Sequence, residues 1–268
     1  MSSAAAQPGL IDISASRRTP FTRLVTLEFR KSYDTRSSFW LLASMGIVTV
    51  IVYTIMLIIA GVNENAHFAY GDFVGGAAFP TSILLPVLAI LLVTSEWSQR
   101  TAMTTFSLEP HRARVIAAKL VVGLGWTFLV AAFATVVGAG ANGLSGLITG
   151  TANWAYVPTG LFAFLITQSL AMLGGFALAT LLLNSPAAIV AFFAYKWVVP
   201  ILFGVAGVYI GWFEKVAAWI EFQNAQGPIW DWELDSGQEW AHLLTSGAFW
   251  LALPLALGLW RVLHAEVK

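Results

Sequence analysis

The chain has 268 residues, no cysteine, and fourteen basic and fourteen acidic side chains, so its formal net charge is zero. Apolar residues make up 58% of it and charged residues only 10%, which is more apolar and less than half as charged as a soluble globular domain. The lack of cysteine excludes disulfides and thiolate metal sites. The composition therefore predicts a membrane protein.

Six stretches are long and apolar enough to cross a bilayer. A transmembrane helix needs roughly 20 mainly apolar residues to cover about 30 Å of hydrocarbon. Such stretches occupy residues 39–61, 73–94, 115–141, 156–183, 187–211 and 243–263. The fourth and fifth are separated only by a short turn containing Pro186, which favours a helix start. We therefore expect an all-α integral membrane protein whose residues 39–263 form a six-span bundle, a single transmembrane domain.

Basic residues are sorted among the connections. Six lie in the first 38 residues, four lie in or beside the second connection, and Arg261 and Lys268 lie near the C-terminal end. The first and third connections have none, and the fifth has only Lys215 beside six acids. By the positive-inside rule, both termini and the second connection face the cytoplasm. The first 38 residues lack the apolar core of a cleavable signal peptide, and residues 1–18 are expected to be a flexible cytoplasmic tail.

Residues 19–38 predict an amphipathic entry helix ahead of the first span. Thr19 suits the N-cap and Pro20 the first helical position, and the apolar side chains of residues 21–29 gather on one side. Such a helix lies along the cytoplasmic membrane surface. Glu28 projects from the apolar side, where a carboxylate is costly unless paired. It should therefore meet Lys31, Arg36 or a cation of another element. The alternative is a generic positively charged anchor. The candidate functional residues of this helix are four of its charged side chains, Glu28, Arg30, Lys31 and Arg36.

The second connection, residues 96–114, is polar between two apolar spans. Glu96 and Trp97 stand where the second span leaves the membrane, and tryptophan favours that interface. Pro110 ends any helix at Glu109, and a new helix then leads into the third span. The pattern indicates a short cytoplasmic element whose mixed surface suits docking to another protein. The alternative is a basic loop that only sets topology; the polar residues concerned are Glu96, Arg100, Thr101, Pro110, Arg112, Arg114 and Lys119.

The fifth connection, residues 212–235, has an aromatic side. Trp212, Phe213 and Trp219 fall on one side of a helix that continues to Gln223, with Glu214 and Glu221 opposite. This pattern predicts a helical segment that lies on, or re-enters, the outer face of the membrane; the alternative is an exposed acidic loop. Ser236 and Glu239 form a capping-box pattern that begins the last helix.

Lys196 is the one ionisable residue well inside a span. An intramembrane cation usually faces a cavity or a partner, which makes it a candidate functional residue. Phe192 and Phe193 share its side, and Trp197 is its neighbour. We expect the four to line a hydrated pathway between two subunits. The alternative is a lysine that reaches carbonyl groups or an acid for helix packing alone.

Catalytic patterns are missing from the sequence. No G-x-x-x-x-G-K-[ST] is present to bind nucleotide phosphates. The four histidines have no metal-ligand spacing, and a nucleic-acid partner does not suit a neutral membrane chain. The sequence therefore predicts neither an enzyme nor a metal site.

The whole pattern resembles the permease subunits of bacterial ABC exporters of the type-2 class. The resemblance rests on the entry segment LEFRKSYDTRS, the six spans, and the passage SEWSQRTAMTTFSLEPHRARVIAAKL between spans two and three. In that family this passage runs acid, threonine, proline, arginine and then a lysine entering span three. Glu96, Thr101, Pro110, Arg112 and Lys119 match, whereas Arg100 stands where many relatives have a glycine-rich turn.

The resemblance implies a function for each part. Residues 96–114 would be the coupling helix that inserts into a separate ABC ATPase, which itself binds ATP and magnesium. Two permease copies, as a homodimer or heterodimer, would enclose the pathway in a bacterial plasma membrane, with the lipid bilayer around them. The alternative function is a non-transporting immunity or scaffold subunit, or a channel.

Overall fold

The computed structural model describes residues 19–63, 65–99, 101–155 and 158–264. Within this part of the chain, six helical stretches are long and apolar enough to cross a membrane. They comprise Arg36–Val62, Tyr70–Ser98, Arg112–Thr149, Pro158–Leu182, Ser185–Tyr209 and Gly237–His264. The predicted helical architecture, with six helices long and apolar enough to span a membrane, is thus confirmed for the described residues. The predicted tail, residues 1–18, lies outside the described part, as do Arg100 and the first residues of the predicted fourth span.

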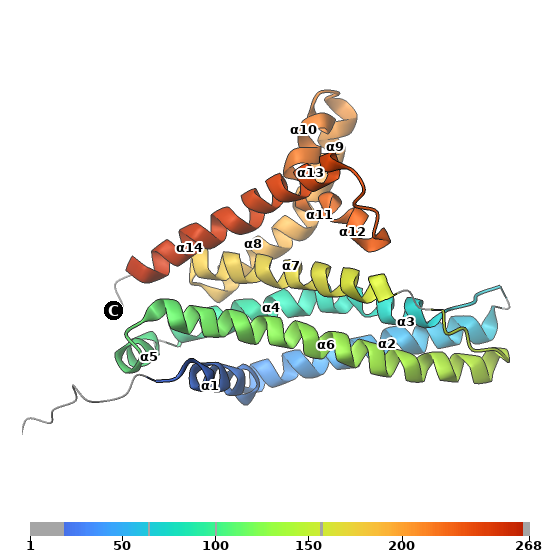
Figure 1. The fold of residues 1–268 in the computed structure, drawn as a ribbon, viewed down its shortest axis with the longest axis horizontal. Helices are drawn as coiled ribbons and strands as arrows, with labels where there is room; N and C mark the ends of the chain where they lie inside the picture. Colours follow the sequence, from blue (N-terminus) through green and yellow to red (C-terminus); the bar gives the residue numbers. More distant parts are fainter. Residues whose placement is uncertain (1–18, 64, 100, 156–157, 265–268) are drawn as a thin grey trace, which may run out of the picture.

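The spans run back and forth between two ends of an elongated bundle (Figure 1). At one end lie helix α1 (Phe21–Asp34), helix α5 (Ala102–Leu108) and the end of helix α14 (Leu253–His264). We call this the basic end, because the lysines and arginines of α1 and α6 gather there. At the other end, the connection before α3 (Tyr70–Gly76) pairs with the one after α6 (Arg112–Thr149), where Tyr70 N donates to Asn153 O at 2.9 Å.

The centre of the bundle is built from α4 (Ala78–Ser98), α6 and α7 (Pro158–Leu182), with α2 (Arg36–Val62) beside them. Large side chains on these helices are fully buried, including Leu85, Phe164 and Phe176. Two glycines permit the closest approaches to α7. A Cβ on Gly175 would lie 2.6 Å from Pro86 O, and a Cβ on Gly258 would collide with Thr180. Small residues at such crossings are typical of membrane helices.

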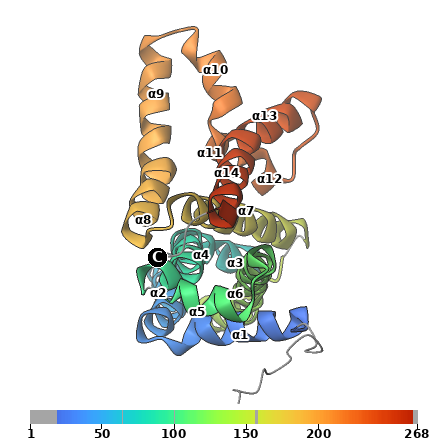
Figure 2. The same ribbon diagram turned by 90° about the vertical axis from the view of Figure 1, so that its left-hand side faces the viewer.

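The fifth and sixth spans leave this centre. Helix α8 (Ser185–Phe193) follows the short turn after α7, and the Asn184 side chain caps it by accepting from Ala187 N. The π-helical segment η1 (Ala194–Val198) then leads into α9 (Val199–Tyr209), which has no buried residue. Figure 2 shows α9 and α10 (Phe213–Ile220) standing away from the bundle.

The chain then folds back onto α7. The short helix α11 (Phe222–Ala225) leads into α12 (Gly227–Asp231), which lies beside α7, and Phe222 and Ile229 are buried. The last span comprises α13 (Gly237–Gly247), the π-helical segment η2 (Ala248–Ala252) and α14. The Ser236–Glu239 capping box at its start is confirmed.

Several predicted boundaries were wrong. The entry helix begins at Phe21 with Pro20 as its N-cap, and it ends at Asp34 rather than at residue 38. Thr35 caps the next helix, accepting from Ser38 N at 3.2 Å, so Arg36 belongs to the first span. The third span runs to Thr149, where Gly150 with a φ of 85° ends it, and the glycines within it do not interrupt the helix. Gly146 lies directly against Ala152.

Candidate functional site

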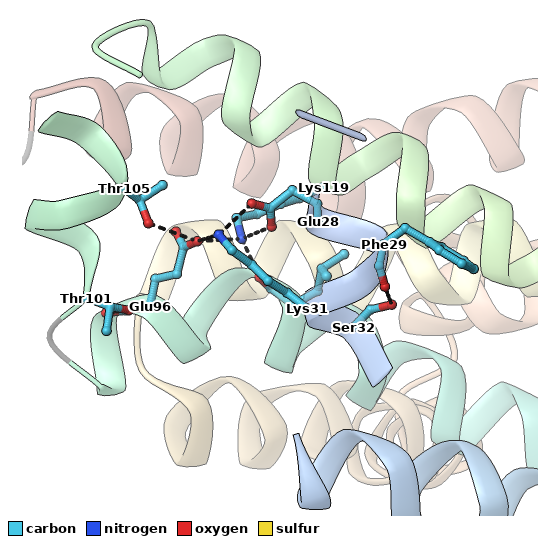
Figure 3. A network of polar contacts seen from close by, with 9 residues as sticks. Glu28, Phe29, Lys31, Ser32, Glu96, Thr101, Thr105 and Lys119 are labelled. Carbon is cyan, nitrogen blue, oxygen red and sulfur yellow. Dashed lines mark hydrogen bonds and ion pairs between the residues drawn. The ribbon is translucent and has the colours of Figure 1, made fainter. Parts of the chain in front are cut away.

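Four charged side chains from three helices meet inside the basic end of the bundle (Figure 3). Lys31 Nζ in α1 lies 2.8 Å from both Glu28 Oε1 and Glu96 Oε1. Lys119 Nζ in α6 lies 2.5 Å from Glu28 Oε2 and 3.2 Å from Glu96 Oε1. We call these four residues the charge cluster. It contains two acids and two bases, so it is neutral as a unit.

The charge cluster forms because α1 docks on α6. Phe29 stacks on Trp126 with ring centroids 5.3 Å apart, and Trp126 Nε1 donates to Ser32 Oγ at 2.8 Å. Leu24, Glu28 and Ser32 are the buried residues of α1, at helical spacing of four. The buried face of α1 therefore carries a carboxylate in its middle, opposite Lys119.

Burial makes these charges depend on one another. The side chains of Glu28, Glu96 and Lys119 are 5%, 7% and 2% exposed, whereas that of Lys31 is 48% exposed. Lys119 has three acceptors, since its ammonium also donates to Leu92 O at 2.9 Å. Desolvation of Lys31 opposes its charged form, but the charges and hydrogen bonds of Glu28 and Glu96 outweigh it and raise the pKa of Lys31. Lys31 is thereby held as a cation at neutral pH.

Helix α5 is attached to the same cluster. Thr105 Oγ1 donates to Glu96 Oε1 at 3.3 Å, and Thr101 N donates to Glu96 O at 2.9 Å. Phe106 is buried beside Trp97, with ring centroids 6.1 Å apart. The opposite side of α5 is open, with Met103 54% exposed and Ser107 also exposed.

The two arginines that follow α5 have partners within the chain. Arg112 Nη1 donates to Val262 O in α14 at 2.9 Å, and its guanidinium lies 5.0 Å from the Phe106 ring centroid. Arg114 binds Glu109 at 3.1 Å and donates to Thr19 O at 2.6 Å. These contacts tie the α5–α6 connection to the segment just before α1 and to α14.

The sequence predicted some of this arrangement. Glu28 does have the partner that its position required, and one partner is Lys31, as expected. Glu96, Thr101 and Lys119 come together around it, whereas Arg30 and Arg36 are exposed and form no ion pair within the described ranges. Pro110 is exposed after the C-cap residue of α5, Glu109. The Glu28–Lys119 contact joins residues 91 positions apart. The sequence indicated it only through the place of Glu28 on the apolar side of the entry helix.

The residues predicted to line a pathway lie at the junction of α8 and η1. Phe192 is buried and lines a cavity together with Lys196. Phe193 is partly buried against the core, and Trp197 is 44% exposed. Lys196 Nζ lies 5.8 Å from the Trp197 ring centroid. No carboxylate in the described part of the chain forms an ion pair with it.

The aromatic residues of the fifth connection are distributed differently from the prediction. Helix α10 ends at Ile220, so the predicted single helix through Gln223 was wrong. Glu221 instead caps α11 by accepting from Asn224 N at 3.2 Å. Burial raises the pKa of its carboxyl group. Trp212 and Trp219 are 68% and 43% exposed, and Phe213 packs on Phe203 with centroids 5.2 Å apart.

No model of a known protein family matches the sequence, and no curated protein matches it either. Among the described residues, no group of three or more histidine, aspartate or glutamate side chains is placed to hold a metal ion.

Proposed function

We propose that the chain is the permease subunit of an ATP-driven exporter, working as a dimer with separate ABC ATPase subunits. The outer-face placement of α10–α12 and the cytoplasmic placement of the basic end, in a bacterial plasma membrane, belong to the same proposal. The sequence pattern of residues 96–114 motivates it, since the chain itself has no nucleotide-binding motif.

The attachment of α5 is the observation that carries the proposal. One side of α5 is held by Glu96 and Trp97, and Glu96 in turn binds α1 and α6 through the charge cluster. The other side, with Met103 and Ser107, is free for a partner. If that partner displaced α5, the movement would be transmitted through short polar contacts to α1, α4 and α6. This arrangement suits an element that transmits force.

The test should change the open side of α5 and leave the arginines intact. Arg112 and Arg114 are bound within the chain, so reversing their charge would disturb the fold as well as any docking. Met103→Glu and Ser107→Arg place charge on the exposed side, where desolvated charges cost a complex several kcal/mol. Gln238→Arg, at an exposed position in α13, is the control.

The measurement is co-purification, from the native membrane, of an ATPase that carries a nucleotide-binding motif. We expect both α5 variants to lose it by more than about tenfold, with thermal stability unchanged, while Gln238→Arg keeps it. Retention of the ATPase at wild-type level in both α5 variants would show that α5 is no coupling element.

A further inference from the structure

A small polar cavity lies where the fifth span meets the folded-back segment. Its volume is about 210 Å³, and its walls come from α4, α7, α8, η1, α11 and α12. Figure 1 shows α11 and α12 on the same side of α7, and Gln223, Gln226 and Trp230 of this segment line the cavity. Polar side chains gather here although the surrounding spans are apolar: Ser82, Thr167, Gln168, Lys196, Gln223 and Gln226.

One of these side chains is buried with an unpartnered polar atom, and a second, partly buried, is a cation without a counter-ion. Gln168 is 1% exposed, and its Nε2 donates to Ala78 O at 3.3 Å, but its Oε1 is buried without a hydrogen-bond donor. Lys196 has no carboxylate partner in the parts of the chain that the structure covers. A buried acceptor without a donor destabilises the folded state by about 1–3 kcal/mol. An unpaired cation within a membrane span has a cost of similar size. The cavity therefore lacks one negative charge and one hydrogen-bond donor.

The backbone at this place is also specialised. Tyr195 and Lys196 belong to η1, and single π turns inside α-helices occur frequently at functional sites. Tyr195 is buried between two rings, since its ring centroid lies 4.6 Å from that of Trp250 and 6.3 Å from that of Phe192. These contacts fix the π turn, and with it the direction in which Lys196 leaves the helix.

We propose that this cavity binds the monoanion of a phosphate group. One P–O⁻ oxygen would accept from the Lys196 ammonium, and the remaining P–OH would donate to Gln168 Oε1. An ionised carboxylate satisfies the lysine but has no proton for Gln168. A phosphomonoester with a second pKa near about 6 retains that proton in part of its population at neutral pH. A cavity of this size holds a phosphate group but not a drug-sized molecule, which needs roughly 300–1,000 Å³.

The phosphate belongs either to a free ion or to the headgroup of a membrane amphiphile. Phe79 and Trp230 both line the cavity and are 60% and 43% exposed, so apolar surface continues outward from it. The proposal is independent of ATP-driven export, because it rests on this cavity alone and not on α5.

The experiment uses the full chain in phosphatidylcholine nanodiscs, with thermal unfolding followed by tryptophan fluorescence. Inorganic phosphate is added in one arm, and phosphatidic acid replaces a tenth of the lipid in another. A ligand at 100 times its Kd raises the unfolding temperature of a domain this size by about 5–10 °C. We expect such a rise with phosphatidic acid in the wild type and none in Lys196→Met. Lys215→Met removes an exposed lysine of α10 and is the control that keeps the rise.

Gln168→Glu is the second variant, because it supplies the missing negative charge within the cavity. It should unfold at a higher temperature than the wild type without ligand, and it should no longer respond to phosphatidic acid. A rise with inorganic phosphate as well identifies a site for the free ion, and a rise with phosphatidic acid alone identifies a headgroup site. Equal responses of wild type, Lys196→Met and Gln168→Glu would overturn the proposal.

Discussion

Replacement of Lys119 by methionine tests the charge cluster directly. Methionine is unbranched and of similar length, so it fills the space of the lysine stem without the charge. The substitution leaves Glu28 and Glu96 buried with Lys31 as their one remaining cation in the cluster. It also leaves Leu92 O without the ammonium donor that lies 2.9 Å away in the wild type. We expect a large loss of stability.

The magnitude follows from burial. Lys119 is 2% exposed and its two carboxylate partners are 5% and 7% exposed, so solvent does not replace the lost cation. Breaking a buried ion pair from one side costs about 3–5 kcal/mol. For a chain of this size, 1 kcal/mol corresponds to about 2–4 °C, so the apparent unfolding temperature should fall by about 10 °C. Lys31→Met is the matched comparison. Because Lys31 is half exposed, water screens its pairs, and its loss should cost about 1 kcal/mol or less.

The assay is thermal unfolding in detergent at pH 7 and at one scan rate, because membrane proteins often unfold irreversibly. The double variant Glu28→Gln/Lys119→Met removes one of the uncompensated carboxylates. It should regain about 0.5–3 kcal/mol of stability relative to Lys119→Met, because residues in direct contact have interaction energies of this size. The reasoning is refuted if Lys119→Met is as mild as Lys31→Met, or if the double variant recovers nothing.

Two further predictions concern topology and helix packing. Single cysteines at Asn65, Asn153 and Gln238 should react with an impermeant thiol reagent from outside the cell, and those at Ser107 and Asn184 only after permeabilisation. All five positions are exposed and the chain has no cysteine of its own, and a reactive Ser107 position in intact cells would invert the orientation. Gly175→Ala should cost about 1–3 kcal/mol through overpacking, since its Cβ would lie 2.6 Å from Pro86 O. Gly125→Ala has no atom within 4 Å of the added carbon and should be neutral or stabilising in the same unfolding assay; equal losses in both would contradict the close approach of α4 and α7.

The sequence predicts features that depend on local runs of residues. Apolar length identified the six helices that are long and apolar enough to cross a membrane, and the Ser236–Glu239 spacing identified the start of the last one. Glu28 was recognised as needing a cation because its place on an apolar face is costly. Features that depend on distant contacts were missed, since nothing near Glu28 indicates a lysine 91 residues away.

The end of α10 shows a second kind of feature that the sequence did not predict. The aromatic periodicity of residues 212–223 continues through Glu221, so the pattern alone predicts one helix. The chain turns there because the Glu221 side chain accepts from Asn224 N and starts α11. The cavity beside Lys196 exists only because α11 and α12 fold back onto α7. Its polar residues come from four separate segments, and the sequence indicated only Lys196.

The π-helical segment η1 also sets a rotational offset along the fifth span. A π turn accommodates one more residue than an α turn, so every side chain beyond Val198 is turned about 100° from where an uninterrupted helix would place it. The half before the turn buries Ala188 and Phe192, and the half after it buries no residue. Deleting a single residue within η1 would shorten the span by one position. It would also rotate α9 by about 100° around the helix axis. A different row of its side chains would then face the surroundings of the helix.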